Sequence, residues 1–407
     1  MVACDASLQT LSWEEESSWG EAVTTMTYGV RLIEPIDPAG ITQTMLTPDR
    51  VVAVRNDGTK GTPGPWSIAF NFSCWWTGRG SSSASSVTLT DLYRLLGHAL
   101  GGATVAASAG TTLTGGTATV PMTTASGTFA AGGLCFIGLL GDGDGNGQAA
   151  AIGTHSTTNL NLLTAIDDAP ANGAVLYAPD LAYLAPSVCS RTGLRFRLQT
   201  ADGQWVVHGC AITAALVQLS PGERPRINFS VVGSWAEPIN TTFPAAPASP
   251  DAFPGQIHSA GGSCFLQAVG TTTRAKVSLR SLSIDIGLGM VPVIGGSGVS
   301  NYQTITGATS TTDTVTVSAV VDANGASATP DQWDAWLTNT NEQMLVTLNT
   351  GDGNGRAIYL RNMCRAGPRP SQTALNGRNT VPLQWMAYNG TTTTSDLTRS
   401  ALVMAGY

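Results

Sequence analysis

The chain has 407 residues, a formal net charge of −7 at pH 7 and 42% hydrophobic residues. This length predicts two or three domains with sizeable cores. No run approaches the roughly 20 consecutive apolar residues that cross a bilayer. Residues 14–16 are all Glu and do not fit the basic start of a secretory signal. We therefore expect a protein that neither crosses a membrane nor is exported.

The composition favours strands over helices. The chain has 47 Gly residues and many Thr and Val residues, which are typical of short strands and tight turns. Apolar stripes at helical spacing are few. We predict a mainly β protein.

The first distinctive segment is a proline-bearing loop at residues 34–65, with five prolines and charges of both signs. A long ordered loop in a compact domain is usually functional, so we expect this one to contact a partner. The charged residues that we expect to make this contact are Asp49, Arg50, Arg55, Asp57 and Lys60.

Two short helices are predicted, one in each half of the chain. Each has apolar residues at positions i, i+3 and i+4. In the second, Thr329 suits the N-cap and Pro330 the first helical position. The apolar stripes are Leu92, Leu95 and Leu96 after Asp91, and Trp333, Trp336 and Leu337 after Asp331.

A segment of alternating apolar and polar residues follows each helix, and the two segments look like copies of one unit. Matched positions are first 150 and later 154 residues apart, so we expect four extra residues in the Asp-Gly-Asn-Gly turn of the second copy. The matched pairs are Leu194 with Met344, Phe196 with Val346, Leu198 with Leu348, Cys210 with Cys364, Ile227 with Val381, and Phe229 with Leu383.

The first copy holds an insertion that the second lacks. From Leu92 to Leu194 is 102 residues, but from Trp333 to Met344 is only 11. Residues 102–187 contain no Lys or Arg, and they read as short strands between Gly- and Thr-rich turns. We predict a small all-β domain there.

Proline-rich residues 238–254 have the composition of a semi-rigid linker. The predicted organisation is therefore a first unit at residues 1–101 and 188–240, an inserted domain at 102–187, a linker at 241–254 and a second unit at 255–407.

Residues 142–147 match the first half of a calcium loop. However, Gly153 stands at position twelve, where a bidentate Glu is required. The related residues 352–355 lack the second acid. Asp-Gly and Asn-Gly between alternating apolar segments favour a hairpin turn, and weak calcium binding at 142–147 stays open.

Other site chemistry is sparse. The four histidines lie in no metal-ligand spacing, and Gly262-Ser263-Cys264 is not a nucleophile elbow. The seven cysteines show no C-x-x-C spacing, so we expect buried free thiols rather than disulfides or zinc. We predict no enzyme activity, no catalytic residue, no metal and no cofactor. The cysteines are Cys4, Cys74, Cys135, Cys189, Cys210, Cys264 and Cys364.

Several elements together carry a family resemblance. They are Trp-Gly-Glu-Ala-Val at 19–23, the strand at 30–33, the Trp-rich strand ending at 74–76, the helix at 91, the strand at 282–286 and the closing hairpins. In this order they resemble the major tail tube protein of a long, non-contractile-tailed bacteriophage (siphophage). The resemblance covers nearly the whole chain as a pattern of elements and rests on no invariant motif.

The resemblance implies two tandem tail-tube-like β-sandwich units, each with a flanking α-helix, plus the small inserted β domain. In this family four long strands per unit join those of neighbours into a cylinder around a lumen, and a long loop, here 34–65, reaches the adjoining ring. Two units per chain imply a trimer ring with pseudo-sixfold symmetry. One unit per chain would imply a hexamer.

The implied function is that of a structural virion protein, whose stacked rings form the tube that conducts the DNA genome during ejection. The implied partners are further copies of the chain and other tail proteins, such as tape measure, distal tail and tail terminator proteins. DNA passes through the lumen without specific binding, since a neutral or acidic wall avoids phosphate contacts. The implied location is the virion tail, assembled in the host cytoplasm.

Two other classes share this composition. An exported adhesin or surface-layer module would be equally rich in Thr and Gly. A β-sandwich hydrolase would need clustered carboxylates, whereas the clearest acidic pairs, Asp142 with Asp144 and Asp167 with Asp168, lie in turn-like settings.

Overall fold

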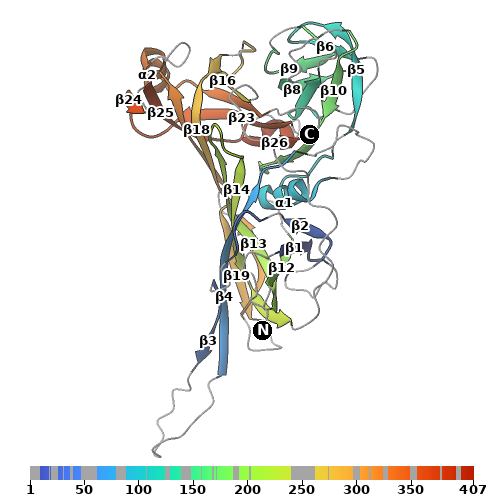
Figure 1. The fold of residues 1–407 in the computed structure, drawn as a ribbon, viewed down its shortest axis with the longest axis vertical. Helices are drawn as coiled ribbons and strands as arrows, with labels where there is room; N and C mark the ends of the chain where they lie inside the picture. The colour runs from blue at the N-terminus through green and yellow to red at the C-terminus, as the bar shows by residue number, and fades with distance from the viewer. Residues whose placement is uncertain are drawn as a thin grey trace, which may run out of the picture.

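The computed structural model describes residues 10–17, 19, 26–30, 32–36, 40–46, 62–78, 89–106, 108–123, 129–138, 148–156, 158–166, 169–170, 172–186, 192–200, 203–239, 262–273, 275–296, 303–310, 313–323, 329–348, 355–375, 378–390 and 396–407. The fold is mainly β, which confirms the predicted class. Figure 1 shows an elongated lobe with β12, β13 and β19 in it and β3 and β4 at its lower end, and two groups of strands above it: β16, β18 and β23 to β26 on the left, and β5, β6 and β8 to β10 on the right.

One long antiparallel sheet runs through both halves of the chain. Its strands alternate in direction throughout, and β24 (Thr373–Leu375) takes over beside β25 where β23 has ended. The order is β3 (Ile41–Leu46), β4 (Thr62–Trp75), β14 (Arg226–Gly233), β13 (Gly203–Leu219), β18 (Leu279–Gly287), β21 (Thr314–Asp322), β25 (Arg378–Ala387) and β23 (Arg356–Arg365).

Two shorter sheets pack against the long one, and their strand orders correspond. β13 and β23 each belong to a short sheet with their first residues and to the long sheet with their last. The first short sheet is β2 (Tyr28–Val30), β1 (Thr10–Glu15), β12 (Leu194–Thr200), β13 and β15 (Trp235–Ile239). The second is β17 (Lys276–Val277), β16 (Gly262–Ala268), β22 (Glu342–Leu348), β23, β26 (Leu402–Gly406) and β11 (Asp180–Tyr183).

Strand register corrects the expected position of the extra residues. Leu198 pairs with Trp205, and Leu348 pairs with Arg356, so the partners are 151 residues apart. Further along, Ile212 pairs with Val231 and Arg365 pairs with Trp385, so Ile212 and Arg365 are 153 apart. Of the four extra residues, one therefore lies in the turn and two lie within β23, between Arg356 and Arg365. The prediction of four extra residues in the turn was wrong. Matching the two sequences gives the spacing between equivalent residues, but it does not show where a strand bulges.

The predicted loop at 34–65 is in part a hairpin. Its residues 41–46 pair with β4, including Met45 opposite Pro63. A corresponding hairpin extends the second half, where β19 (Met290–Gly296) pairs with β20 (Gln303–Ser310). The prolines misled the prediction of a loop, because proline is tolerated at the first residue of a strand and on edge strands.

Both predicted helices are confirmed as α1 (Asp91–Leu100) and α2 (Thr329–Thr338). A third, α3 (Asp396–Arg399), precedes β26. α1 ends where Gly101 adopts a positive φ of 74° and its N–H donates to the carbonyl of Gly97, which is the usual role of glycine at a helix C-terminus.

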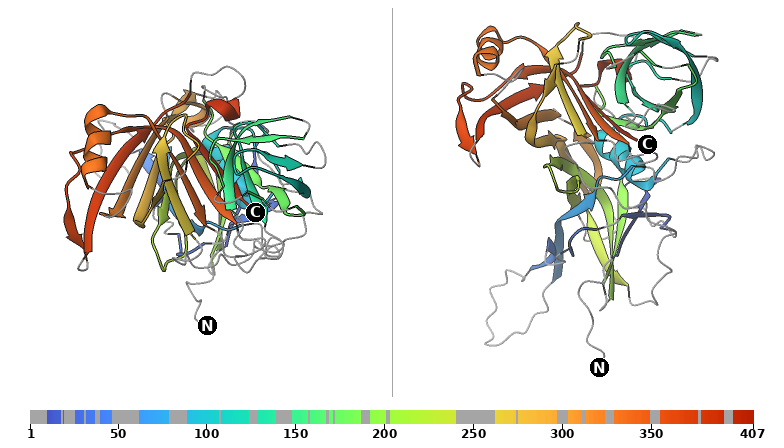
Figure 2. Two further views of the ribbon diagram at one scale, coloured as in Figure 1. Left: turned by 90° about the horizontal axis from the view of Figure 1, so that it is seen from above. Right: turned by 45° about the horizontal axis from the view of Figure 1, so that its top comes forward.

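Most of the predicted insertion forms a separate sheet that curls on itself. The Leu162 N–H donates to the Thr119 carbonyl (2.9 Å), which closes a ring of strands around an apolar core of its own. Figure 2, right, looks along this ring. Its order is β6 (Pro121–Thr123), β5 (Ser108–Gly116), β10 (Val175–Ala178), β7 (Leu134–Gly138), β8 (Gln148–His155) and β9 (Leu160–Leu162).

The end of the predicted insertion belongs to the main body instead. β11 lies within residues 102–187, yet it pairs along its whole length with β26 at the end of the chain. Val105 also bridges to Leu181. The curled sheet therefore begins after residue 106 and ends at Ala178.

Candidate assembly surfaces

The two halves of the long sheet join head to tail within the chain. β13 closes the first set of four strands, and its residues 214–219 pair with residues 282–287 of β18, which opens the second set. The second set, β18, β21, β25 and β23, is joined in the same sequence as β3, β4, β14 and β13. This junction shows how one copy of the pattern attaches to the next.

The sheet has an open edge at each end. Within the described residues, β3 pairs only with β4, and β24 pairs only with β25. Unpaired edge strands present free N–H and C=O groups that pair readily with another chain. β3 occupies the same place in its set as β18, and β23 the same place as β13, so the two open edges are complementary in type and direction.

Prolines interrupt the open edge of the sheet between β23 and β24. Between β23 and β24, residues 366–372 form no strand and include Pro368 and Pro370. The matching stretch of β13, residues 214–219, has no proline and carries the whole junction with β18. Because proline has no N–H to donate, a ladder like that of β13 cannot continue through this stretch.

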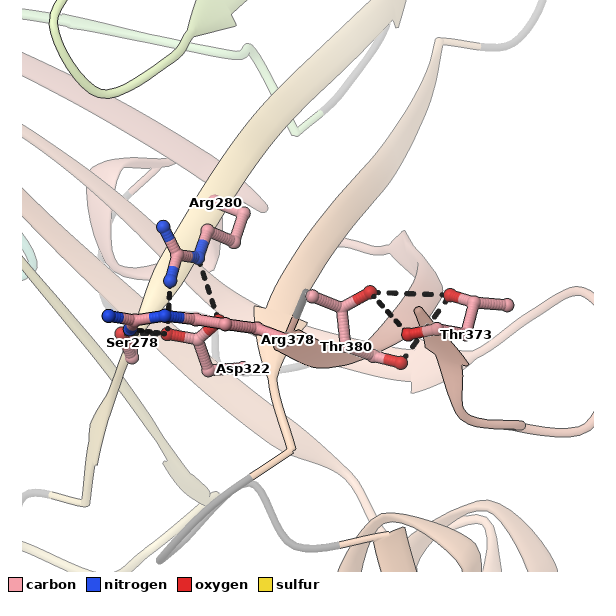
Figure 3. Close-up of polar contacts among 6 residues, drawn as sticks. All are labelled: Ser278, Arg280, Asp322, Thr373, Arg378 and Thr380. Carbon is pink, nitrogen blue, oxygen red and sulfur yellow. Dashed lines mark hydrogen bonds and ion pairs between the residues drawn. The ribbon is translucent and has the colours of Figure 1, made fainter. Parts of the chain in front are cut away.

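A polar cluster fixes the strands beside this edge (Figure 3). Asp322, at the end of β21, is 4% exposed and accepts hydrogen bonds from Arg280 Nε (2.7 Å), Arg280 Nη2 (3.0 Å) and Ser278 Oγ (2.9 Å). Arg378 Nη1 lies 3.7 Å from Asp322 Oδ2. The hydrogen bonds from Arg280 lower the pKa of Asp322 and outweigh the effect of burial. The carboxylate thus stays ionised and links β18, β21 and β25.

A second contact in Figure 3 holds the outermost strand. Thr380 Oγ1, on β25, donates to the carbonyl of Thr373 on β24 (3.1 Å), and the two hydroxyls lie 3.3 Å apart. Thr380 is 1% exposed, whereas all three residues of β24 are exposed. β24 is therefore held on one side by β25 and faces solvent on the other.

One face of the long sheet packs on the core, and the opposite face is open and nearly neutral. Side chains on the open face form rows that cross six strands. Most are small or uncharged, and all are partly or fully exposed. One row is Ser73, Asn228, Leu216, Asp285, Thr316 and Met386, and the next is Trp75, Arg226, Gln218, Ser283, Ser318 and Gln384.

Arg226, the cationic residue of these two rows, is hydrogen-bonded to a neighbouring side chain. Arg226 Nε donates to Gln218 Oε1 (2.7 Å), and Asn228 Nδ2 donates to the same oxygen (3.2 Å). Asp285 is the other charged residue of the two rows. A polyanion that moves along this face therefore meets little positive charge.

Four of the five described cysteines are buried, as expected, and Cys364 is only partly buried. The buried ones are Cys74, Cys135, Cys210 and Cys264, and none of the five is in a disulfide. Burial raises the pKa of Cys264 to about 12 and also raises that of Cys210. Both thiols stay protonated at neutral pH, which makes them poor nucleophiles.

A cleft of about 420 Å³ lies beside α1. It is lined in part by Glu15, Arg94 and His98, and His98 Nε2 contacts Glu15 Oε1. Among the described residues, no group of three or more His, Cys, Asp or Glu side chains is arranged to hold a metal ion. The turn-like residues 142–147 and 352–354 lie outside the described residues.

The predicted contact residues Asp49, Arg50, Arg55, Asp57 and Lys60 also lie outside the described residues, so their role stays a prediction. Sequence reasoning missed the open face and the edges. The alternation of small polar residues in Ser281, Ser283 and Asp285 was an available signal for the face. The edges had none, because pairing between strands far apart in sequence leaves no local pattern.

No family model and no curated protein matches the chain. Within the part of the chain that the structure describes, no helix is long and apolar enough to cross a membrane.

Proposed function

We propose that this protein is a structural component of a virion, a tail tube protein of a long, non-contractile-tailed bacteriophage, and that its stacked rings conduct the DNA genome during ejection. The observation that carries the proposal is the head-to-tail junction between β13 and β18. A heterologous contact of this kind, repeated between chains, closes into a ring when the rotation per unit permits.

The proposal treats the chain as two tandem tube units, the second at residues 255–407, with the curled sheet as a peripheral insertion. Each unit supplies four strands to the long sheet. Three chains then give about 24 strands, wider than the 16 to 18 strands that already leave an aqueous channel in a porin. The proposed ring is a trimer with pseudo-sixfold symmetry.

The open face of the sheet suits the wall of such a channel. DNA binds through phosphate contacts to Lys and Arg, and the cation of the two central rows, Arg226, is held by Gln218. The β3–β4 and β19–β20 hairpins both lie in the elongated lower lobe, and β3 with the adjoining part of β4 projects from its end (Figure 1), which suits contacts between successive rings. The remaining proposed partners are the tape measure, distal tail and tail terminator proteins.

Electron microscopy of the purified protein tests the proposal, combined with mass measurement of isolated rings. We expect tubes or rings, with a ring mass of about 126 kDa for three chains of 41.9 kDa each. A ring of six chains would show that the second half does not act as a tube unit. Monomers at all concentrations would contradict the proposal and favour the adhesin or hydrolase alternative.

A further inference from the structure

We infer that the exposed aromatic side of α2 is the docking surface for the first short sheet of the next copy of the chain, at β13 and β15. This inference rests on the proposed head-to-tail assembly and adds a second contact to it, beyond the sheet edges.

α2 is fixed on one side, and its other side is aromatic, with the Arg369 guanidinium over the Trp333 ring (3.6 Å to the ring centroid). Arg365 Nη2 donates to Gln332 Oε1 (2.6 Å), and Arg365 also pairs with the buried Glu342 (Nε to Oε2, 2.6 Å). On the other side Trp333 and Trp336 are only partly buried, with ring centroids 6.4 Å apart, and Leu337 is 66% exposed. An anchored helix with exposed Trp and Leu side chains has the composition of an interface.

The corresponding helix of the first half shows what covers such a surface. α1 also follows the last strand of a hairpin and precedes the first strand of the repeated segment. Its apolar residues, from Leu92 to Leu100, are at most 6% exposed. Much of the cover comes from β11 and β13, and part of it comes from the second half, because Tyr93 packs against Gly406 of β26. Close by, Arg356 Nη1 of β23 donates to the Trp76 carbonyl (2.8 Å).

Strand correspondence then identifies the surface that covers α2. β26 pairs with the first residues of β23 just as β15 pairs with the first residues of β13. α1 packs mainly on β11 and β13, and its Tyr93 reaches β26 of the following half, close to the contact of Arg356 with Trp76. By correspondence, we expect the helix of the second half to meet β13 and β15 of the half that follows it, which belongs to the next copy.

The residue of the first short sheet that corresponds to Arg356 is Trp205, which suits an apolar contact. Arg356 is opposite Leu348, and Trp205 is opposite the matching Leu198. Trp205 thus stands on the first short sheet where Arg356 stands on the second, and it is partly exposed. The contact would join Trp333, Trp336 and Leu337 of one copy to Trp205 of the next, and tryptophans dominate binding energy in many interfaces.

A photo-crosslink locates this contact directly. Benzoyl-phenylalanine is placed at position 337 in the full-length chain, the protein is assembled and irradiated, and crosslinked peptides are identified by mass spectrometry. We expect crosslinks between chains to residues 203–208 or 235–239. Rings that crosslink elsewhere would overturn the inference and leave the proposed function intact. If these crosslinks form but no closed rings are seen, the contact is supported and the proposed tube is overturned. If neither crosslinks nor rings form, both the inference and the proposed function are overturned.

A pair of matched variants gives the energetic test. Leu337→Asp should raise the protein concentration needed for assembly at least tenfold, while the thermal unfolding of the monomer stays unchanged. Met386→Asp changes a similarly exposed apolar residue (46%) on the open face and should leave assembly at the wild-type concentration. Equal effects of the two substitutions would overturn the inference.

Discussion

Arg280 holds Asp322 through two parallel hydrogen bonds, Nε to Oδ1 at 2.7 Å and Nη2 to Oδ2 at 3.0 Å. The two residues lie on neighbouring strands of the second half, at the end of the sheet near the open β24 edge. Because Ser278 and Arg378 approach the same carboxylate, one buried anion links three strands there. The cluster therefore stabilises the strands beside the edge that we propose for assembly.

Replacing Asp322 by Asn should lower the free energy of unfolding at pH 7 by about 1.5–3 kcal/mol, the scale of a hydrogen bond to a charged group. The pKa of Asp322 is lowered in the folded state, so its contribution is present above the unfolded pKa of about 4 and is lost as pH falls through the folded pKa. Urea unfolding at pH 7 and below pH 3 measures the difference.

The matched control is Asp285→Asn, at an exposed carboxylate on the neighbouring part of β18. We expect that substitution to change stability by less than about 0.5 kcal/mol at either pH, as for most surface changes. An equal loss for Asp322→Asn at pH 7 and at low pH would show that the carboxylate charge is not what stabilises the strands.

The prolines of the outer edge should limit uncontrolled pairing. Pro368→Thr combined with Pro370→Thr restores two N–H donors to residues 366–372, which now interrupt the edge. We expect faster, irregular aggregation, measured by light scattering and electron microscopy, since proline is a common protection of edge strands. Ser371→Thr, in the same stretch, adds no donor and should behave as wild type. Aggregation no faster than wild type in the double variant would contradict this role.

Local patterns were enough to predict part of this fold. The i, i+3, i+4 stripes at Leu92 and at Trp333 located both helices. The alternation of apolar and polar residues located β12 and β22, because the period of a strand is two, although all seven residues of β22 are buried. These signals depend on residues that are neighbours along one element.

Long-range pairing was beyond the same reasoning. β11 joins β26 across more than 200 residues, and nothing near Leu181 in the sequence indicates that partner. The sequence also gives no sign that β13 pairs with β18, since both segments have the pattern of ordinary half-buried strands. Pro63 indicated a loop where the chain forms a hairpin arm. The candidate surfaces depend on these pairings, so the sequence could indicate a resemblance but not the edges.

Removing the curled sheet tests its peripheral placement. Because Val105 bridges to Leu181, residues 107–178 can be replaced by a short Gly-Ser linker that leaves β11 in place. We expect tubes to form. The melting temperature should fall, because Phe136 and Ala149 no longer cover the apolar surface around Val403. Loss of assembly in a protein that remains folded would contradict a peripheral role.

The end of the insertion should not be removable in the same way. Asp180 and Leu181 are at most 3% exposed, and β26 would lose its outer partner. Deleting all of residues 102–187 should therefore unfold or aggregate the second half, as seen by circular dichroism and gel filtration. Normal tubes from this larger deletion would show that β11 contributes little.

The charged residues between β3 and β4 in the sequence should stack rings rather than build them. Replacing Arg50, Arg55 and Lys60 by Glu reverses the charges that lie near Asp49 and Asp57 in sequence. Charge complementarity mainly governs association and its salt dependence. We expect short tubes or single rings of folded protein in electron micrographs. Tubes of normal length and salt resistance would eliminate this role.

Adding positive charge to the open face tests whether it lines the DNA channel. Ser283 and Ser318 are cross-strand neighbours in a row that crosses six strands, and each is partly or fully exposed. Ser283→Arg with Ser318→Arg should leave tubes intact but make them retain short duplex DNA at 50 mM salt. The retained DNA should be released at higher salt, because each phosphate contact adds a slope of about −0.9 to log K against log salt. Wild-type tubes should retain none, as measured by co-sedimentation with labelled DNA.

The matched control is Thr112→Arg with Thr114→Arg, which adds the same charge to exposed positions of β5 on the curled sheet. DNA retention equal in the two double variants would place the open face outside the channel, because DNA held by an outer surface would not distinguish the two sites.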